Sequence, residues 1–233
     1  MRVRHIQVII TVVIAFILSS CGENKSEGGQ QGAAVQKPAG ESAASVQKQI
    51  ILFFGNSLTA GYGLEDPSAQ AFPAIVQYKI DSAQLAYKVV NAGLSGETSA
   101  DGKNRIGWVL KQKVDVFVLE LGANDGLRGI PVKETIKNLQ AIIDTVKLEY
   151  PEAKLVMLGM QVPPNMGADY ASQFKTIFPQ LAVKNKMALV PFLLDGVGGI
   201  PQLNQRDGIH PTAEGARIVA SNVWKVLRPL LKQ

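Results

Sequence analysis

Two side chains far apart in the sequence have the chemistry of a nucleophile and its base. Ser57 follows an apolar run and lies among glycines and small polar residues, in the stretch FFGNSLTAGYG. A serine hydroxyl becomes a nucleophile near neutral pH only when a base takes its proton, and an imidazole is the usual base. His210 is the only histidine besides His5, which lies in the N-terminal segment. Ser57 and His210 are therefore the candidate pair for nucleophilic catalysis.

A carboxylate stands three residues before this histidine, in the run DGIHP. Asp207 could accept a hydrogen bond from the imidazole of His210 and fix its tautomer, as the acid of a serine-histidine-aspartate triad does. The same run also suits a surface turn that leads into a helix, with Thr212 as the N-cap. The spacing of Asp207 and His210 alone does not decide between these interpretations.

The alternation of strand and helix patterns predicts the scaffold that must position these residues. Five short apolar runs are typical of strands buried on both faces, and helical patterns lie between them, as at 131–150 and in the final segment 212–231. Strands that alternate with helices imply right-handed crossovers and a parallel sheet. The sequence thus predicts a five-stranded parallel sheet in a three-layer α/β/α sandwich. The predicted strands are residues 49–54, 88–92, 114–121, 154–160 and 187–193.

Small or polar residues follow four of the five predicted strands. GNSL follows the first strand, NAG the second, GAND the third and DGIHP the fifth. The loops after the carboxyl ends of parallel strands form the binding sites of such sheets. We therefore expect these four segments to meet at one site.

These segments resemble, in order and spacing, the motif blocks of the SGNH or GDSL hydrolase family. The resemblance extends over residues 50–230 and includes the sequence segments LTAGYG, GETSADG, ELGANDGLRG and DGIHP. It implies the flavodoxin-like SGNH hydrolase fold. It also implies a serine esterase that hydrolyses acyl esters or thioesters, such as lysophospholipids and short to medium acyl or aryl esters, with no cofactor.

Family roles can be carried over to the matching positions. The resemblance implies that Ser57 attacks the carbonyl carbon, that His210 takes the proton and that Asp207 orients the imidazole. The oxyanion would be held by the backbone N–H groups of Ser57 and Gly93 and by the side-chain amide of Asn124. Deacylation of the acyl-enzyme would use His210 again, to activate water.

The residue before the nucleophile departs from the family pattern. Asn56 stands where the family usually has aspartate. An asparagine keeps a carbonyl acceptor and nearly the same shape but lacks the charge. Because the triad acid is assigned to Asp207, we expect catalysis to survive and Asn56 to support the site structurally.

Other functions can be weighed against this one. The chain has no GxSxG elbow and no GxxxxGK[ST] phosphate loop, and with His210 as the one histidine of the mature chain we expect no metal site. An envelope carbohydrate O-deacetylase of the same fold and a catalytically silent, ligand-binding surface lipoprotein stay open as alternatives. In the loop after the fourth predicted strand, Met166 and Tyr170 could form a wall of an acyl pocket.

The N-terminal part of the chain has the features of an export signal. Residues 1–20 combine a basic start with an apolar run of h-region length, and they precede Cys21, the only cysteine. The pattern resembles a bacterial lipobox, so we expect Cys21 to carry lipid. Residues 21–48 then form a flexible tether, and residues 49–233 form the hydrolase domain. The expected location is a membrane, facing the periplasm or the cell exterior.

The charge pattern gives no support for nucleic-acid binding. The formal net charge is +5, and the lysines are scattered, with no basic run beside a set of aromatic residues. We expect a monomer whose partners are a small acyl substrate and, through the lipid anchor, a membrane.

Overall fold

The computed structural model describes residues 47–232. The predicted signal peptide, Cys21 and most of the predicted tether lie outside the described residues. Within the described range, no helix has both the length and the apolar character needed to cross a membrane.

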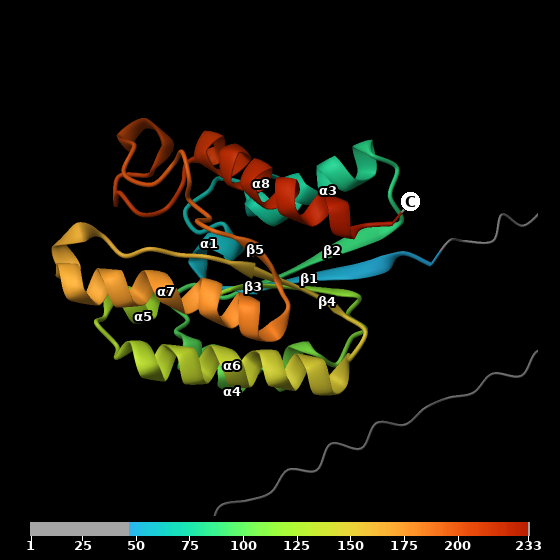
Figure 1. Cartoon of the computed structure of the whole chain (residues 1–233). Coiled ribbons are helices and arrows are strands. Elements are labelled where there is room, and N and C mark those ends of the chain that lie inside the picture. The colour runs from blue at the N-terminus through green and yellow to red at the C-terminus, as the bar shows by residue number, and fades with distance from the viewer. Residues whose placement is uncertain (1–46, 233) are drawn as a thin grey trace, which may run out of the picture. The chain divides into compact units, whose positions relative to one another are not determined.

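One parallel sheet of five strands forms the centre of the domain (Figure 1). Its order is β2-β1-β3-β4-β5, the doubly wound order of flavodoxin-like folds. The predicted parallel sheet is confirmed. The strands are β1 (Gln49–Gly55), β2 (Tyr87–Gly93), β3 (Val116–Glu120), β4 (Lys154–Leu158) and β5 (Ala188–Val190).

Helices cover both faces of the sheet, so the predicted three layers are present (Figure 1). On one face α3 (Phe72–Ser82) packs against α8 (Ala213–Leu227). On the other face α6 (Val132–Glu149) packs between α4 (Ser99–Val109) and α7 (Ala168–Asn185). The shorter elements are α1 (Ser57–Ala60), α2 (Pro67–Gln70), α5 (Ala123–Leu127), η1 (Pro164–Met166), η2 (Pro201–Leu203) and η3 (Arg228–Leu230).

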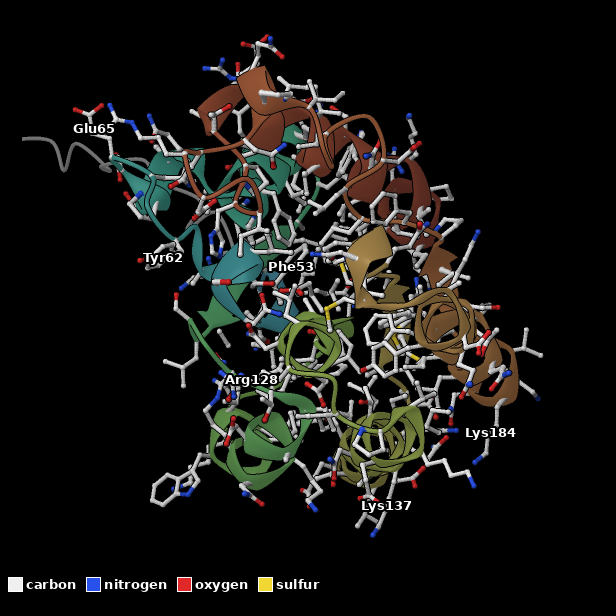
Figure 2. The ribbon with its side chains drawn as sticks, turned by 90° about the vertical axis from the view of Figure 1, so that its left-hand side faces the viewer. Phe53, Tyr62, Glu65, Arg128, Lys137 and Lys184 are labelled. Atoms are coloured by element: carbon white, nitrogen blue, oxygen red, sulfur yellow. The ribbon has the colours of Figure 1, made fainter. Side chains whose placement is uncertain are left out.

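The central strands are buried and the edge strands less so, because a sheet edge has no neighbour on one side. All five residues of β3 are buried, whereas β2 and β5 at the two edges are partly exposed. Figure 2 shows the domain from the side where the carboxyl ends of the strands lie. In this view Phe53 points into the interior, while Lys137 and Lys184 point outward. Phe53 is fully buried and packs edge-on against Phe72 of α3.

The third and fourth strands end one and two residues before their predicted ends, at Glu120 and Leu158. The fifth strand and the last helix also end early, each near a proline. The fifth strand stops at Val190 because Pro191 has no N–H to continue the ladder. The last helix stops at Leu227 and continues as a 3₁₀ turn that contains Pro229. Its start agrees with the sequence, since the hydroxyl of Thr212 accepts a hydrogen bond from Gly215 N–H at 3.3 Å.

Candidate active site

Ser57 lies at the first position of a four-residue helix that follows β1 directly. Its side chain is largely buried, with the residue 9% exposed. Asn56 is the N-cap of this helix, and its Oδ1 accepts the N–H of Leu58 at 3.0 Å. Asn56 thus holds a backbone N–H of the turn that carries Ser57.

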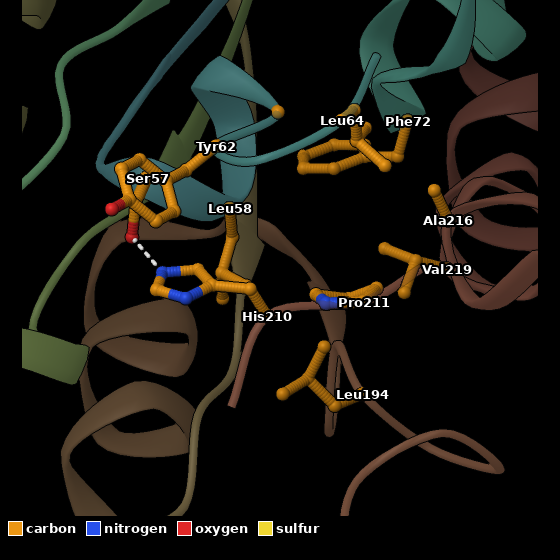
Figure 3. Close-up of a pocket in the computed structure, with 11 residues that line it drawn as sticks. Ser57, Leu58, Tyr62, Leu64, Phe72, Leu194, His210, Pro211, Ala216 and Val219 are labelled. Carbon is orange, nitrogen blue, oxygen red and sulfur yellow. Dashed lines mark hydrogen bonds between the residues drawn. The ribbon is translucent and has the colours of Figure 1, made fainter. Parts of the chain in front are cut away.

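His210 and Asp207 approach the serine from the loop before α8. The Nε2 atom of His210 lies 2.8 Å from Ser57 Oγ, and its Nδ1 atom lies 2.7 Å from Asp207 Oδ2. The first of these contacts is drawn in Figure 3. The structure therefore places the three residues in one hydrogen-bonded chain. The turn and the N-cap at Thr212 are present as well, so the two interpretations of this run are compatible.

Hydrogen bonds within the DGIH turn fix the Asp207 carboxylate. Its Oδ1 atom accepts the backbone N–H groups of Ile209 and His210, each at 3.0 Å. Burial raises the pKa of Asp207, but the hydrogen bonds from His210 and Ile209 outweigh that effect and hold the pKa below its ordinary value. The group therefore stays an anion that can accept the imidazole N–H.

Contacts to the loop after α1 hold the histidine loop in place. Gln205 Nε2 donates to the backbone oxygens of Tyr62, at 2.7 Å, and of Pro211, at 3.0 Å. The ring of Tyr62 lies against the imidazole of His210, with 4.8 Å between the ring centroids and 46° between the ring planes. In Figure 3 Tyr62 lies beside both Ser57 and His210. The loop that carries the nucleophile and the loop that carries the base are thus connected directly.

Asn124 and Gly96 line the same cavity as the serine. The Nδ2 atom of Asn124 donates to Glu97 O at 2.9 Å, which uses one of its two hydrogens and leaves the other. The backbone N–H of Gly96 makes no backbone hydrogen bond within residues 47–232. The helix that carries Asn124 is fixed by its neighbour Asp125, a buried carboxylate that accepts the N–H of Ser99 at 2.8 Å.

Gly93 does not take the position expected for an oxyanion donor. Its N–H already donates to Asn91 Oδ1 at 2.9 Å, and it does not line the cavity. A Cβ atom at Gly93 would lie 2.2 Å from Ala60 N, so glycine is needed there for the close approach of α1 to β2. The expectation for Gly93 is corrected in favour of Gly96, three residues further along the loop.

An arginine joins the loop after β2 to the rest of the domain. Arg105 of α4 binds both oxygens of the buried Glu97 carboxylate, with its Nε at 2.5 Å and its Nη2 at 2.6 Å. Nη2 also donates to Ala92 O at 3.0 Å, and the guanidinium carbon lies 4.4 Å from the ring centroid of Phe54. Because Glu97 O accepts the Asn124 amide, this ion pair fixes the neighbourhood of Asn124 and Gly96. The sequence reasoning did not identify Arg105.

A cavity of about 650 Å³ opens next to the serine. One wall comes from the loop after β4, through Met160, Val162 and Pro163. The expectation that Met166 and Tyr170 form this wall is wrong, because the lining residues come earlier in the loop. The hydroxyl of Tyr170 instead donates to Ile130 O at 2.7 Å.

Comparison with known proteins places this chain in a family. The sequence model of the GDSL-like lipase/acylhydrolase family matches residues 53–218. The chain belongs to this family. It is accordingly a serine esterase, a hydrolase of carboxylic esters, and the resemblance predicted from the sequence is confirmed.

Similar proteins have been described under several enzyme names. The chain is 38% identical over 182 residues to the "Thioesterase 1/protease 1/lysophospholipase L1" of Escherichia coli strain K12, covering 78% of this chain and 84% of that protein. It is 36% identical over 187 residues to an "Arylesterase" of Vibrio mimicus, covering 80% of this chain and 92% of that protein. The crystal structure of TesA is 41% identical with a TM-score of 0.74, covering 78% of this chain and all of that one.

Proposed function

We propose that Ser57, His210 and Asp207 are the catalytic triad of this esterase. The observation that carries the proposal is the unbroken chain of contacts from Ser57 Oγ to His210 Nε2 and from Nδ1 to the Asp207 carboxylate. In the first step Oγ attacks the carbonyl carbon while Nε2 takes its proton, and the imidazolium then protonates the leaving group. Water, deprotonated by the same imidazole, releases the acyl group from Ser57.

We assign the oxyanion to three donors, the N–H groups of Ser57 and Gly96 and the side-chain amide of Asn124. As the first residue of its helix, Ser57 has no intrahelical acceptor for its N–H. Gly96 and Asn124 line the cavity beside it. Fixed donors of this kind stabilise the negative charge that develops on the carbonyl oxygen, because they need no reorganisation during the reaction.

We propose that the substrates are acyl esters or thioesters with an acyl chain longer than acetyl, including lysophospholipids and aryl esters. The shape and lining of the cavity support this class, since an acetyl group would fill little of it and apolar side chains suit a hydrocarbon chain. The names of the relatives from E. coli and V. mimicus agree with it. The apolar lining comes from Leu127, Met160, Val162, Pro163, Phe192, Leu194 and Ile209.

Rates with a series of substrates test this proposal against the two alternatives. We expect kcat/KM for p-nitrophenyl esters to rise from acetyl through butyryl to octanoyl, and lysophospholipid to be cleaved faster than an acetylated sugar. The reverse order would indicate an O-deacetylase. Turnover that is equal in Ser57→Ala and in the parent protein would remove the triad assignment. Absence of turnover by the parent protein with every ester of the series would favour a silent binding protein.

We propose, from the sequence, that the enzyme is exported and anchored through lipid on Cys21. Residues 1–20 would be removed as the signal, and residues 21–48 would tether the domain at a membrane that faces the periplasm or the cell exterior. Growth with a radioactive fatty acid should label the protein, and Cys21→Ser should abolish the label. Equal labelling of both forms would contradict the anchor.

A further inference from the structure

A buried carboxyl group lies under the turn that carries the nucleophile. Glu120 is the last residue of β3, opposite Gly55 in the register, and its side chain is fully buried. Its Oε2 atom accepts the backbone N–H of Asn56 at 3.0 Å and the hydroxyl of Thr59 at 2.8 Å. Glu120 therefore holds the residue before Ser57 and a residue two positions after it.

The missing side chain of Gly55 makes room for this contact. A Cβ atom at Gly55 would lie 2.6 Å from Glu120 Oε2 and 2.2 Å from Thr59 Oγ1. No larger residue fits there while the carboxyl group and the hydroxyl keep their positions. The end of β1 is thus shaped to let Glu120 reach the turn.

One donor and one acceptor remain unmatched at this place. Asn56 Nδ2 and Glu120 Oε1 are both buried, and neither has a hydrogen-bond partner among the described residues. The two side chains are neighbours, because Asn56 donates its backbone N–H to the other oxygen of the same carboxyl group. Burial raises the pKa of Glu120 to about 7, although hydrogen bonds from Thr59 and from the backbone N–H of Asn56 act in the opposite direction.

We propose that Glu120 is a positioning residue for the nucleophile and that the side-chain amide of Asn56 is its third hydrogen-bond donor. The proposal rests on the role of Ser57 proposed above. Glu120 does not line the cavity and contacts neither Ser57 Oγ nor His210, so it acts only through the turn. Three donors on one carboxyl group fix the backbone on both sides of Ser57 and keep Oγ within reach of Nε2.

Exchanging the amide and the carboxyl group between the two positions tests the contact. In Glu120→Gln an amide nitrogen faces the amide nitrogen of Asn56, so two donors oppose each other. In the double variant Asn56→Asp with Glu120→Gln, the glutamine amide donates to the new carboxylate. In the full-length protein we expect Glu120→Gln to lower kcat about tenfold with little change in KM, as an unpaired buried donor should. We expect the double variant to return to within about threefold of the parent, because contacting residues are coupled.

The cycle is completed by Asn56→Asp alone and read both as kcat and as thermal unfolding temperature. An effect of Glu120→Gln that is equal in the Asn56 and the Asn56→Asp backgrounds would overturn the proposal, as would a rise in KM with kcat unchanged. If the glutamine variants do not fold, Thr59→Val and Thr59→Ser provide the test. We expect the valine to lower kcat and the serine, which keeps the hydroxyl, to retain it, whereas equal rates would overturn the proposal.

Ser57→Ala, measured in parallel, separates this inference from the proposed function. Activity in Ser57→Ala removes the triad. An inactive Ser57→Ala together with an uncoupled cycle removes only the role of Glu120.

Discussion

Replacing Asn124 by alanine separates an oxyanion donor from a structural amide. As a structural group, the side chain contributes one hydrogen bond, to Glu97 O at 2.9 Å, and the loss of such a bond costs about 1 kcal/mol of stability. As an oxyanion donor, its remaining hydrogen acts only in the transition state, and its loss costs about 3 kcal/mol, or 10²- to 10³-fold in kcat. We expect the larger effect, on kcat and not on KM.

Asn185→Ala is a control for the structural cost of removing an asparagine side chain. Asn185 lies at the end of α7, outside the cavity. Its Nδ2 also donates to a backbone oxygen, that of Leu181 at 3.0 Å, and in addition to Gln140 Oε1 at 2.9 Å. Both variants should lower the unfolding temperature, by about 2 to 4 °C per kcal/mol for a domain of this size, and Asn185→Ala should lower it more because it loses more hydrogen bonds. Only Asn124→Ala should lose activity in p-nitrophenyl ester hydrolysis. A kcat within about threefold of the parent, or equal losses in the two variants, would refute the assignment.

Three further results are expected. Gly93→Ala should lower the unfolding temperature more than Gly96→Ala. The Cβ at Gly93 would lie 2.2 Å from the backbone atom Ala60 N, whereas the Cβ at Gly96 meets no atom within 4 Å and adds only the strain of a positive φ, +82°. The opposite order in a melting experiment would contradict the packing role given to Gly93. Glu120 has a pKa raised from 4.5 to about 7 in the folded state, so the folded protein binds more protons than the unfolded chain between these values, and the stabilisation present below pH 4.5 is lost as pH rises to 7. Urea unfolding measures this loss. Relative to Glu120→Gln, the free energy of unfolding of the parent protein should fall by on the order of 3 kcal/mol across this range, at 1.36 kcal/mol per pKa unit. Parallel pH profiles of the two proteins would refute the raised pKa. Arg105→Ala leaves the buried Glu97 carboxylate without its cation, so the free energy of unfolding should fall by about 3 kcal/mol and kcat should fall with it. An unchanged kcat in a folded variant would show that the ion pair does not fix the loop after β2, which carries Gly96.

The sequence predicts the proposed triad because the residue types present leave few choices. Residues 21–233 hold one histidine, His210, and Asp207 stands three residues before it, which permits an imidazole–carboxylate contact without requiring one. The sheet follows from apolar runs whose length and spacing match buried strands. Only the ends were misjudged, as at Pro191, where the apolar pattern continues past the last ladder bond.

The parts that the sequence does not predict depend on distances between loops. Gly93 is the last residue of the second strand, and the expectation that site residues lie at strand ends therefore favours it as the oxyanion donor. The loop continues beyond it, however, and brings Gly96 to the cavity. The sequence gives one sign of the role of Glu120, because it is the only acidic residue in the apolar run VFVLEL. A carboxyl group that is buried there needs hydrogen-bond donors nearby. Those donors, on Asn56 and Thr59, become neighbours of Glu120 only when β1 pairs with β3.

Covalent capture of the nucleophile tests the central claim most directly. The purified protein is treated with diethyl p-nitrophenyl phosphate, which transfers its phosphoryl group to an activated serine and releases p-nitrophenol. Peptide mass spectrometry should find one stoichiometric diethylphosphoryl adduct, on the peptide that contains Ser57. Ser57→Ala should form no such adduct, and His210→Ala should form it much more slowly than the parent protein. A stoichiometric adduct on another residue, or labelling of His210→Ala as fast as the parent, would contradict the account.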